Sequence, residues 1–297
     1  MRNEERRRCA WDIIRRSGSG PQHPGLGTLR AQRSVTPGLI PVNLMAPGEE
    51  DAVLLEAIVH TALRPAVLVQ DGRAMAWPPE WAHLAANVDA IAFASARTGR
   101  VEIEGDPALD WVGTGFVVDE RLVATNRHVL EEFAFQDPRH GWRMRDGMRV
   151  WLDFAEEIGG QRSQEVPVTG IWGVHDTFDL DLLQMGPGCP SPLSFAHTIA
   201  VPGEEVLTIG YPAFDSRRND ATAMQQVFRG IYNIKRLLPG LIIEAPESPW
   251  LVRHDCSTLG GNSGSPVLRP ATAEVVGIHF RGLYLRWNEA ISPTARR

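Results

Sequence analysis

A long series of short β-favouring runs constrains the fold of this 297-residue chain more than any other feature. From Val88 onward, short apolar and β-branched runs alternate with Gly, Pro and Asp. Many short strands with such turns predict antiparallel barrels or sandwiches rather than alternating α/β units. The predicted strands cover residues 90–95, 100–104, 113–118, 122–125, 150–154, 165–174, 179–185, 205–210, 225–231, 241–244, 265–268 and 274–280.

The first 84 residues follow a different pattern. Residues 1–48 carry eight arginines against three acidic residues, a net charge of +5, so the remaining 249 residues sum to −6 − 5 = −11. The composition of residues 1–48 predicts a basic flexible leader. A solvated leader is the favoured interpretation, contact with a regulatory partner is the alternative, and a nucleic-acid partner is not expected. Residues 49–84 predict an extension, with a helix from about 50 to 63 and a strand over 66–69.

The composition excludes a membrane-spanning protein. The chain is 43% hydrophobic and 22% charged, which is ordinary for a globular protein. It contains no run of about 18 apolar residues. No apolar stretch of signal-peptide length follows the basic N-terminus, so we expect a cytoplasmic location and no membrane partner.

The three cysteines are Cys9, Cys189 and Cys256. An odd number cannot all pair, and their wide spacing matches no zinc motif. We therefore expect free buried thiols, and neither a metal nor another cofactor.

A serine between glycines is the strongest sign of chemistry. Residues 261–266 read Gly-Asn-Ser-Gly-Ser-Pro, with Ser263 flanked by residues that permit a tight turn. Such a turn directs backbone N–H groups at one point, where a carbonyl oxygen would become negative during nucleophilic attack. Because an alcohol holds its proton tightly, Ser263 needs a base within hydrogen-bond reach.

His128 is the predicted base. Imidazole has an unperturbed pKa of about 6.5, so it can accept and return a proton near neutral pH. A predicted hairpin of residues 115–118 and 122–124, with its turn at 119–121, ends just before His128. This arrangement predicts a histidine at a strand end that faces a cleft.

An acidic segment lies between the histidine and the serine. Asp176, Asp179 and Asp181 are close together there, and a strand with period two can direct Asp179 and Asp181 to the same face. Histidine, aspartate and serine in this chain order form one known arrangement of the serine-protease triad. The residues alone leave the choice of aspartate open.

Four ordered motifs together resemble the trypsin-like, or chymotrypsin-fold, peptidases, and in particular the bacterial branch that includes the glutamyl endopeptidases. The motifs are Gly-Thr-Gly-Phe at 113–116, Thr-Asn-Arg-His at 125–128, Asp179 with the following Leu-Xaa-Leu-Leu, and residues 261–266. The resemblance covers about residues 85 to 291. It implies an all-β fold of two antiparallel six-stranded barrels, the first over about 85–190 and the second over about 200–291. The active site would lie between them.

The family pattern also implies roles for individual residues. It selects Asp179 as the third triad member beside His128 and Ser263, which leaves Asp181 as a residue of the site's rim. The oxyanion hole would be the backbone N–H groups of Gly261 and Ser263. Trypsin-like zymogens carry an aspartate before the serine, whereas this chain has Asn262. A neutral amide cannot pair with a newly cut N-terminal ammonium, so activation of that type is not expected.

Thr258 and His279 are the candidate substrate-binding residues. In the glutamyl endopeptidases, a threonine and a histidine at matching positions hold the acidic side chain of the substrate. A hydroxyl and an imidazolium both donate hydrogen bonds to a carboxylate. Arg281 follows closely and could add positive charge. The resemblance therefore implies a pocket for an acidic residue on the amino side of the cleaved bond.

These features predict a serine endopeptidase that forms an acyl-enzyme on peptide or protein substrates. A role in a bacterial intracellular regulatory or defence system is the expected setting. The alternative from a different class is a catalytically silent peptide-binding module on the same fold.

Overall fold

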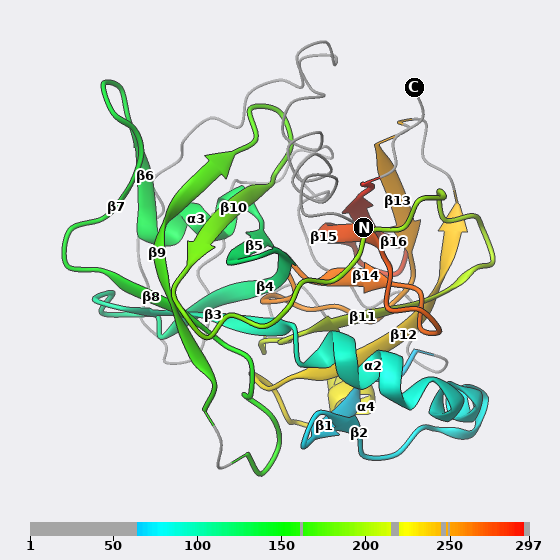
Figure 1. Cartoon of the computed structure of the whole chain (residues 1–297). Coiled ribbons are helices and arrows are strands. Elements are labelled where there is room, and N and C mark those ends of the chain that lie inside the picture. Colours follow the sequence, from blue (N-terminus) through cyan, green and yellow to red (C-terminus); the bar gives the residue numbers. More distant parts are fainter. Residues whose placement is uncertain (1–63, 161–162, 215–219, 245–247, 249, 294–297) are drawn as a thin grey trace.

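A computed structural model describes residues 64–160, 163–214, 220–244, 248 and 250–293. The helix predicted over about 50–63, the basic leader and Cys9 lie outside these residues. Two β-barrels lie side by side, the first coloured cyan to green and the second yellow to red in Figure 1.

Six antiparallel strands close the first barrel. They are β3 (Thr98–Glu104), β4 (Trp111–Asp119), β5 (Leu122–Thr125), β8 (Arg149–Asp153), β9 (Glu165–Val174) and β10 (Asp181–Met185). Their order around the barrel is β10-β5-β4-β3-β8-β9. The predicted hairpin is the β4–β5 pair, which turns through Arg121 at a φ of 58°.

The second barrel is also closed by six antiparallel strands. They are β11 (Glu205–Gly210), β12 (Arg236–Glu244), β13 (Leu251–His254), β14 (Pro266–Leu268), β15 (Val275–Leu283) and β16 (Trp287–Ile291). They pair in the order β11-β14-β15-β16-β13-β12, and pairing of β11 with β12 completes the ring. The expected fold of two six-stranded antiparallel barrels is therefore confirmed.

The amino-terminal extension adds to the second barrel. Strand β1 (Val67–Gln70) pairs with β12 and continues into β2 (Arg73–Ala74). The predicted strand at 66–69 thus exists, one residue further along. A 3-10 helix, η2 (Pro79–Asn87), then leads to the first barrel.

Two predicted strands are helices. Residues 90–95 belong to α2 (Val88–Ser95), which buries Ile91, Ala94 and Ser95. Residues 225–228 end α4 (Ala221–Phe228), where the Asp220 side chain caps the helix by accepting from the Ala223 amide. Both predictions were wrong because short apolar runs suit a buried helix face as well as a strand.

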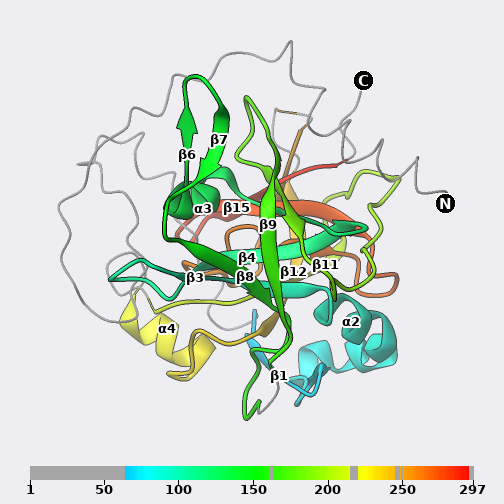
Figure 2. The ribbon, with the colours of Figure 1, turned by 60° about the vertical axis from the view of Figure 1, so that its left-hand side comes forward.

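A small hairpin projects from the first barrel. Helix α3 (Arg127–Phe133) is followed by β6 (Ala134–Asp137) and β7 (Gly141–Met144), which pair only with each other. Figure 2 shows this hairpin rising beside α3 and away from the barrels. The sequence did not predict it.

An apolar cluster joins the two barrels. It combines side chains from β4 and β10 with side chains from β11 and β12, all shielded from water. Burial of this size stabilises the interface, because each fully buried large apolar side chain contributes about 1.5–3 kcal/mol. The main contributors are Phe116, Leu182, Leu207, Ile209 and Leu237.

Candidate functional site

The loop around Ser263 is held by glycines in left-handed conformation. Gly261 has a φ of 93° and Gly264 a φ of 86°, values that L side chains rarely adopt. A Cβ on Gly264 would clash with the carbonyl oxygen of Thr114. The tight turn predicted from the sequence therefore exists, and only glycine fits at its two bends.

The first barrel anchors this loop of the second. The Thr114 amide donates to the Ser263 carbonyl at 2.9 Å, and the Thr114 hydroxyl donates to the Gly261 carbonyl at 2.7 Å. Strand β4 thus fixes the loop relative to the elements that carry the histidine and the aspartate.

His128 lies in the first turn of α3, directly after β5. Its Nε2 is 2.7 Å from Ser263 Oγ, and its Nδ1 is 2.6 Å from Asp179 Oδ2. The His128 amide also donates to Asp179 Oδ1 at 2.9 Å. The structure thus brings together the histidine, the aspartate and the serine that the sequence selected.

The pKa of Asp179 is consistent with its hydrogen bonds to His128. Burial opposes ionisation of Asp179, but the charge of His128 and the hydrogen bonds from its ring and amide outweigh burial. They hold the pKa of Asp179 below its usual value. An ionised Asp179 accepts a hydrogen bond from the N–H at Nδ1, which leaves Nε2 as the acceptor that faces the Ser263 hydroxyl.

Asp181 does not lie on the rim of the site. Its side chain is fully buried at the start of β10, and its pKa is raised well above the usual value by burial and by the charge of Asp179. The rim position was wrong because Asp181 lies inside the sheet of the first barrel, where it pairs with Thr125 of β5 and Val174 of β9.

His279 is buried beside the serine loop. Its carbonyl accepts from the Gly264 amide, and its own amide donates to the Ser265 carbonyl, both at 2.9 Å. Its ring lies against His254 of β13, with Nδ1 3.3 Å from His254 Nε2. Burial, the charge of His254 and the charge of His128 hold the pKa of His279 well below its usual value. This low pKa favours the neutral ring at pH 7 over the imidazolium considered from the sequence.

Thr258 is buried in the same region. Its hydroxyl donates to Asn288 Oδ1 at 2.8 Å, and the Asn288 amide donates to the Cys256 carbonyl at 2.7 Å. Neither His254 nor Asn288 was selected from the sequence. His254 and Asn288 are directly opposite each other in the β13–β16 pair, and this pairing brings both residues to the site. Short motifs in the sequence do not reveal which residues of two separate strands will pair.

Asn262 makes local contacts. Its amide N–H and its side-chain Nδ2 both donate to the Leu259 carbonyl, at 3.1 and 2.9 Å.

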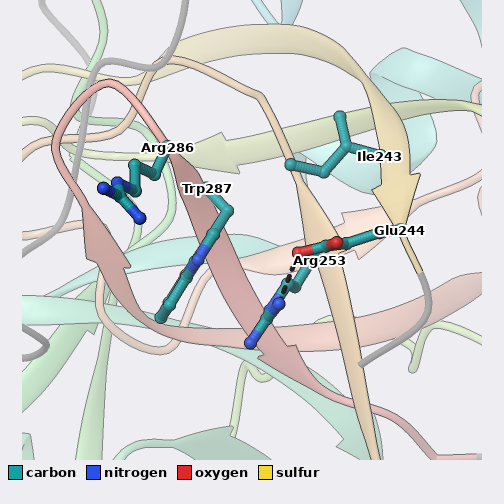
Figure 3. Close-up of a pocket in the computed structure, with 5 residues that line it drawn as sticks. All are labelled: Ile243, Glu244, Arg253, Arg286 and Trp287. Carbon is teal, nitrogen blue, oxygen red and sulfur yellow. Dashed lines mark hydrogen bonds and ion pairs between the residues drawn. The ribbon is translucent and has the colours of Figure 1, made fainter. Parts of the chain in front are cut away.

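Arg281 does not add net charge to the site. Its guanidinium donates to the buried carboxylate of Glu289 at 2.7 Å, and Arg253 donates to the other oxygen of Glu289 at 2.8 Å. Arg253 also pairs with Glu244 and stacks on the ring of Trp287. Glu244, Arg253 and Trp287 line a groove of about 500 Å³ together with Ile243 and Arg286. Figure 3 shows these five side chains.

Three carboxylates outside this region lie close enough together to suggest a metal. Oxygens of Glu102, Asp153 and Glu156 are within 4.8 Å of one another. Arg100 donates to Glu102 at 2.7 Å and lies 3.6 Å from Glu156, so a guanidinium already supplies positive charge there. The cluster therefore needs no metal ion.

The remaining sequence predictions concern thiols and membranes. Cys189 and Cys256 are free, and Cys256 is buried. Within the described residues, no helix has the length and apolarity needed to cross a membrane.

The chain is similar to several known proteins. A probable serine protease of Lysobacter enzymogenes is 25% identical over 294 residues, which cover 86% of this chain and 76% of that protein. A glutamyl endopeptidase of Staphylococcus epidermidis is 27% identical over 190 residues, 60% of this chain and 57% of that protein. Among solved structures, the inactive form of the Rv3671c protease of M. tuberculosis has a TM-score of 0.43 and 18% identity, over 69% of this chain and 87% of that one.

The profile of the trypsin-like peptidase domain matches residues 113–278, which is more than half of the chain and spans every motif described above. The chain therefore belongs to the trypsin-like peptidase family and is a serine protease that acts on peptide or protein substrates.

Proposed function

We propose that the chain cleaves peptide bonds through a triad of His128, Asp179 and Ser263. The observation that carries this proposal is the position of the His128 ring, which bridges Ser263 Oγ at 2.7 Å and Asp179 Oδ2 at 2.6 Å. The His128 side chain is 46% exposed, so a peptide can reach it.

The steps follow from this geometry. His128 Nε2 takes the hydroxyl proton as Ser263 Oγ attacks the carbonyl carbon, and Asp179 stabilises the imidazolium that forms. The C–N bond then breaks, and the leaving amine takes the proton from Nε2. Water attacks the resulting acyl-enzyme with His128 as base, and the acid is released when Oγ regains its proton.

The backbone N–H groups of Gly261 and Ser263 are the proposed oxyanion hole. The amide between them, on Asn262, donates to the Leu259 carbonyl and so takes no part. Because these donors belong to a loop fixed by Thr114, they need little reorganisation when the carbonyl oxygen becomes negative.

Labelling with a fluorophosphonate tests the nucleophile. The probe reacts only with an activated serine, so we expect a covalent adduct on Ser263 of the wild type and none on Ser263→Ala. Ser265→Ala is the matched control, because it removes a hydroxyl from the same loop, and it should still be labelled. An unlabelled wild type, or full labelling of Ser263→Ala, would contradict the proposal.

The finer part of the proposal is a preference for glutamate or aspartate on the amino side of the cleaved bond. Thr258 and His279 are its proposed donors. His279 is joined to the serine loop by two backbone hydrogen bonds, and Thr258 precedes Ser263 by five residues. Their buried setting strengthens a hydrogen bond to a carboxylate. The Thr258 hydroxyl must turn away from Asn288 to donate to the substrate.

Neutral His279 gives this preference a defined pH dependence. A carboxylate entering the pocket favours the imidazolium, so binding takes up a proton and strengthens as the pH falls. We expect the ratio of kcat/KM for matched Glu and Gln peptides to rise between pH 7.5 and 5.5, by up to about tenfold per pH unit. The titration of His128 cancels from the ratio because it affects both peptides equally.

His279→Gln is the control for this measurement, because glutamine nearly fills the space and does not titrate. It should abolish the pH dependence of the Glu/Gln ratio while hydrolysis of a small non-specific ester continues. Equal cleavage after glutamate, leucine and arginine by the wild type would discard the acidic pocket.

The cytoplasmic location and the intracellular regulatory or defence role stay predictions. Contact of the N-terminal extension with a regulatory partner is likewise a prediction, and the leader lies outside the described residues.

A further inference from the structure

An arginine of the amino-terminal extension pairs with a buried carboxylate of the second barrel. The Nε and Nη2 atoms of Arg64 donate to the two oxygens of Asp255, each at 2.7 Å. The Arg64 side chain is 10% exposed and the Asp255 side chain 2% exposed. The guanidinium also lies over the ring of Trp81 in η2, 5.5 Å from its centroid. Two parallel bonds to one carboxylate fix its orientation as well as its charge.

Further hydrogen bonds join the same two parts of the chain. The buried Ser257 hydroxyl donates to the Arg64 carbonyl at 2.7 Å. Two residues further along the extension, the Ala66 carbonyl accepts from Arg236 of β12 at 2.8 Å. Strand β1 then pairs with β12. The extension is thus fixed to the second barrel, and Arg64 contacts the barrel at residues 255 and 257.

These two contacts lie directly before a proposed substrate-binding residue. Asp255 and Ser257 belong to the segment that leads from the end of β13 to Thr258. Asn288 of β16 holds the same segment, because it accepts from the Thr258 hydroxyl at 2.8 Å and donates to the Cys256 carbonyl at 2.7 Å. Residues 255–258 are therefore supported both by the second barrel itself and by the extension.

The loop that carries Ser263 has a different support. The amide and the hydroxyl of Thr114 in β4 donate to the carbonyls of Ser263 and Gly261, respectively. The bonds of Arg64 given above reach residues 255 and 257 instead. Loss of the Arg64 guanidinium should therefore disturb the segment that carries Thr258 more than it disturbs the nucleophile.

We propose that Arg64 is a positioning residue for substrate binding, which fixes the segment that carries Thr258 through its ion pair with Asp255. The amino-terminal extension is thereby part of the support of the substrate pocket. Without the guanidinium, the buried Asp255 carboxylate loses the cation that faces both of its oxygens, which favours movement toward water or uptake of a proton. Either change alters the position of Thr258. The inference rests on the proposed role of Thr258 in binding an acidic side chain.

Kinetics separate substrate positioning from general damage to the enzyme. For Arg64→Met, we expect kcat/KM for a Glu peptide to fall by about ten- to a hundredfold, mostly through a higher KM, because a charge-assisted pair that supports the pocket is lost. The rate of labelling by a small fluorophosphonate should stay close to that of the wild type, since Thr114 holds the serine loop. Arg64→Lys should give a smaller loss, because an ammonium keeps the charge but lacks the planar fork. The exposed Arg73→Met, in the same extension, is the control and should match the wild type.

Asp255→Asn tests the ion pair from its other side. It keeps an oxygen for the Leu241 amide, which donates to Asp255 Oδ1 at 2.7 Å, but it removes the charge. We expect its KM to match that of Arg64→Met, and the double variant to be no worse than either single variant, because both act through one pair. Additive effects would overturn the proposal, as would losses of fluorophosphonate labelling as large as the losses of peptide hydrolysis.

Hydrogen exchange reads the segment independently of catalysis. The Asp255 amide donates to the Leu241 carbonyl at 3.1 Å, and the Thr114 amide donates to the Ser263 carbonyl at 2.9 Å. In Arg64→Met, the amides of Leu241 and Asp255 should exchange faster than in the wild type, whereas the Thr114 amide should keep its rate. Unchanged exchange at Leu241 and Asp255 would overturn the proposal.

Thr258→Val separates this inference from the proposed function. We expect it to raise KM for the Glu peptide, as Arg64→Met does, without faster exchange of the Leu241 amide. A raised KM in Thr258→Val beside an unchanged KM in Arg64→Met would overturn the role of Arg64. An unchanged KM in Thr258→Val would instead defeat the proposed pocket, and an unlabelled wild type would defeat the proposed triad. In both of those cases the exchange rates still decide whether Arg64 holds residues 255–258.

Discussion

Replacing Ser263 or His128 by alanine should lower the rate of peptide hydrolysis by about three orders of magnitude or more. Ser263→Ala removes the proposed attacking oxygen, and His128→Ala removes the ring nitrogen that lies 2.7 Å from it. The two effects should not add, since either loss disables the same step. Turnover of one peptide substrate by both single variants and the double variant measures this, with the melting temperature as the control for folding.

The aspartate is tested with a matched pair. Asp179→Asn should reduce kcat by about 10⁴-fold, because an amide favours the wrong histidine tautomer. Asp181→Asn is the control, as it makes the same change two residues further along the chain. If Asp181→Asn were the more impaired of the two, Asp181 rather than Asp179 would be the third member of the triad.

The three residues of the proposed triad could be predicted because each stands in a sequence motif, and the motifs follow one another in a recognisable order. His128, Asp179 and Ser263 each stand in an extended local pattern, and the structure joins them by hydrogen bonds of 2.6 and 2.7 Å. The two barrels were predictable for a similar reason, since short β runs separated by turn residues recur along the whole of that region. Both predictions rest on residue patterns that are local in the sequence.

The surroundings of the site depend on contacts between distant strands. The neutral state of His279 reflects burial against His254, 25 residues away, which no local pattern reveals. The burial of Asp181 likewise accompanies the pairing of β10 with β5 and β9, two other strands of the first barrel. Sequence reasoning therefore selected the three residues that the structure joins by hydrogen bonds, but it did not reveal the contact of His279 with His254, and it placed the buried Asp181 on the rim.

The chain's single lysine ties the two barrels together. Lys235 is fully buried before β12, and its ammonium donates to the carbonyls of Ser95 at 2.9 Å and Phe154 at 2.6 Å. Glu157 lies 3.6 Å away and supplies the opposite charge. Ser95 ends α2 and Phe154 follows β8, so these bonds cross from the second barrel to the first.

Lys235→Met should therefore lower the free energy of unfolding by about 3 kcal/mol or more, because it leaves two buried carbonyls and the Glu157 carboxylate without their donor. Denaturant unfolding at pH 7 measures the change. The exposed Arg73→Met is the control for loss of a surface cation and should stay within about 0.5 kcal/mol of the wild type. An equal effect of the two substitutions would contradict the role of Lys235.

The wild type and Lys235→Met should differ in free energy of unfolding by an amount that depends on pH. This dependence separates the cost of burying the ammonium charge of Lys235 from the stabilisation that its hydrogen bonds provide. Burial lowers the pKa of Lys235 from 10.5 to about 8, against the opposing charge of Glu157. Between these values the unfolded chain holds the proton and the folded protein does not, so stability contributed by Lys235 rises with pH across this window. Other groups titrate in both proteins and cancel. The gap between wild type and Lys235→Met should accordingly widen from pH 8 to pH 10, and a narrowing gap would mean that the buried ammonium is favoured over the amine.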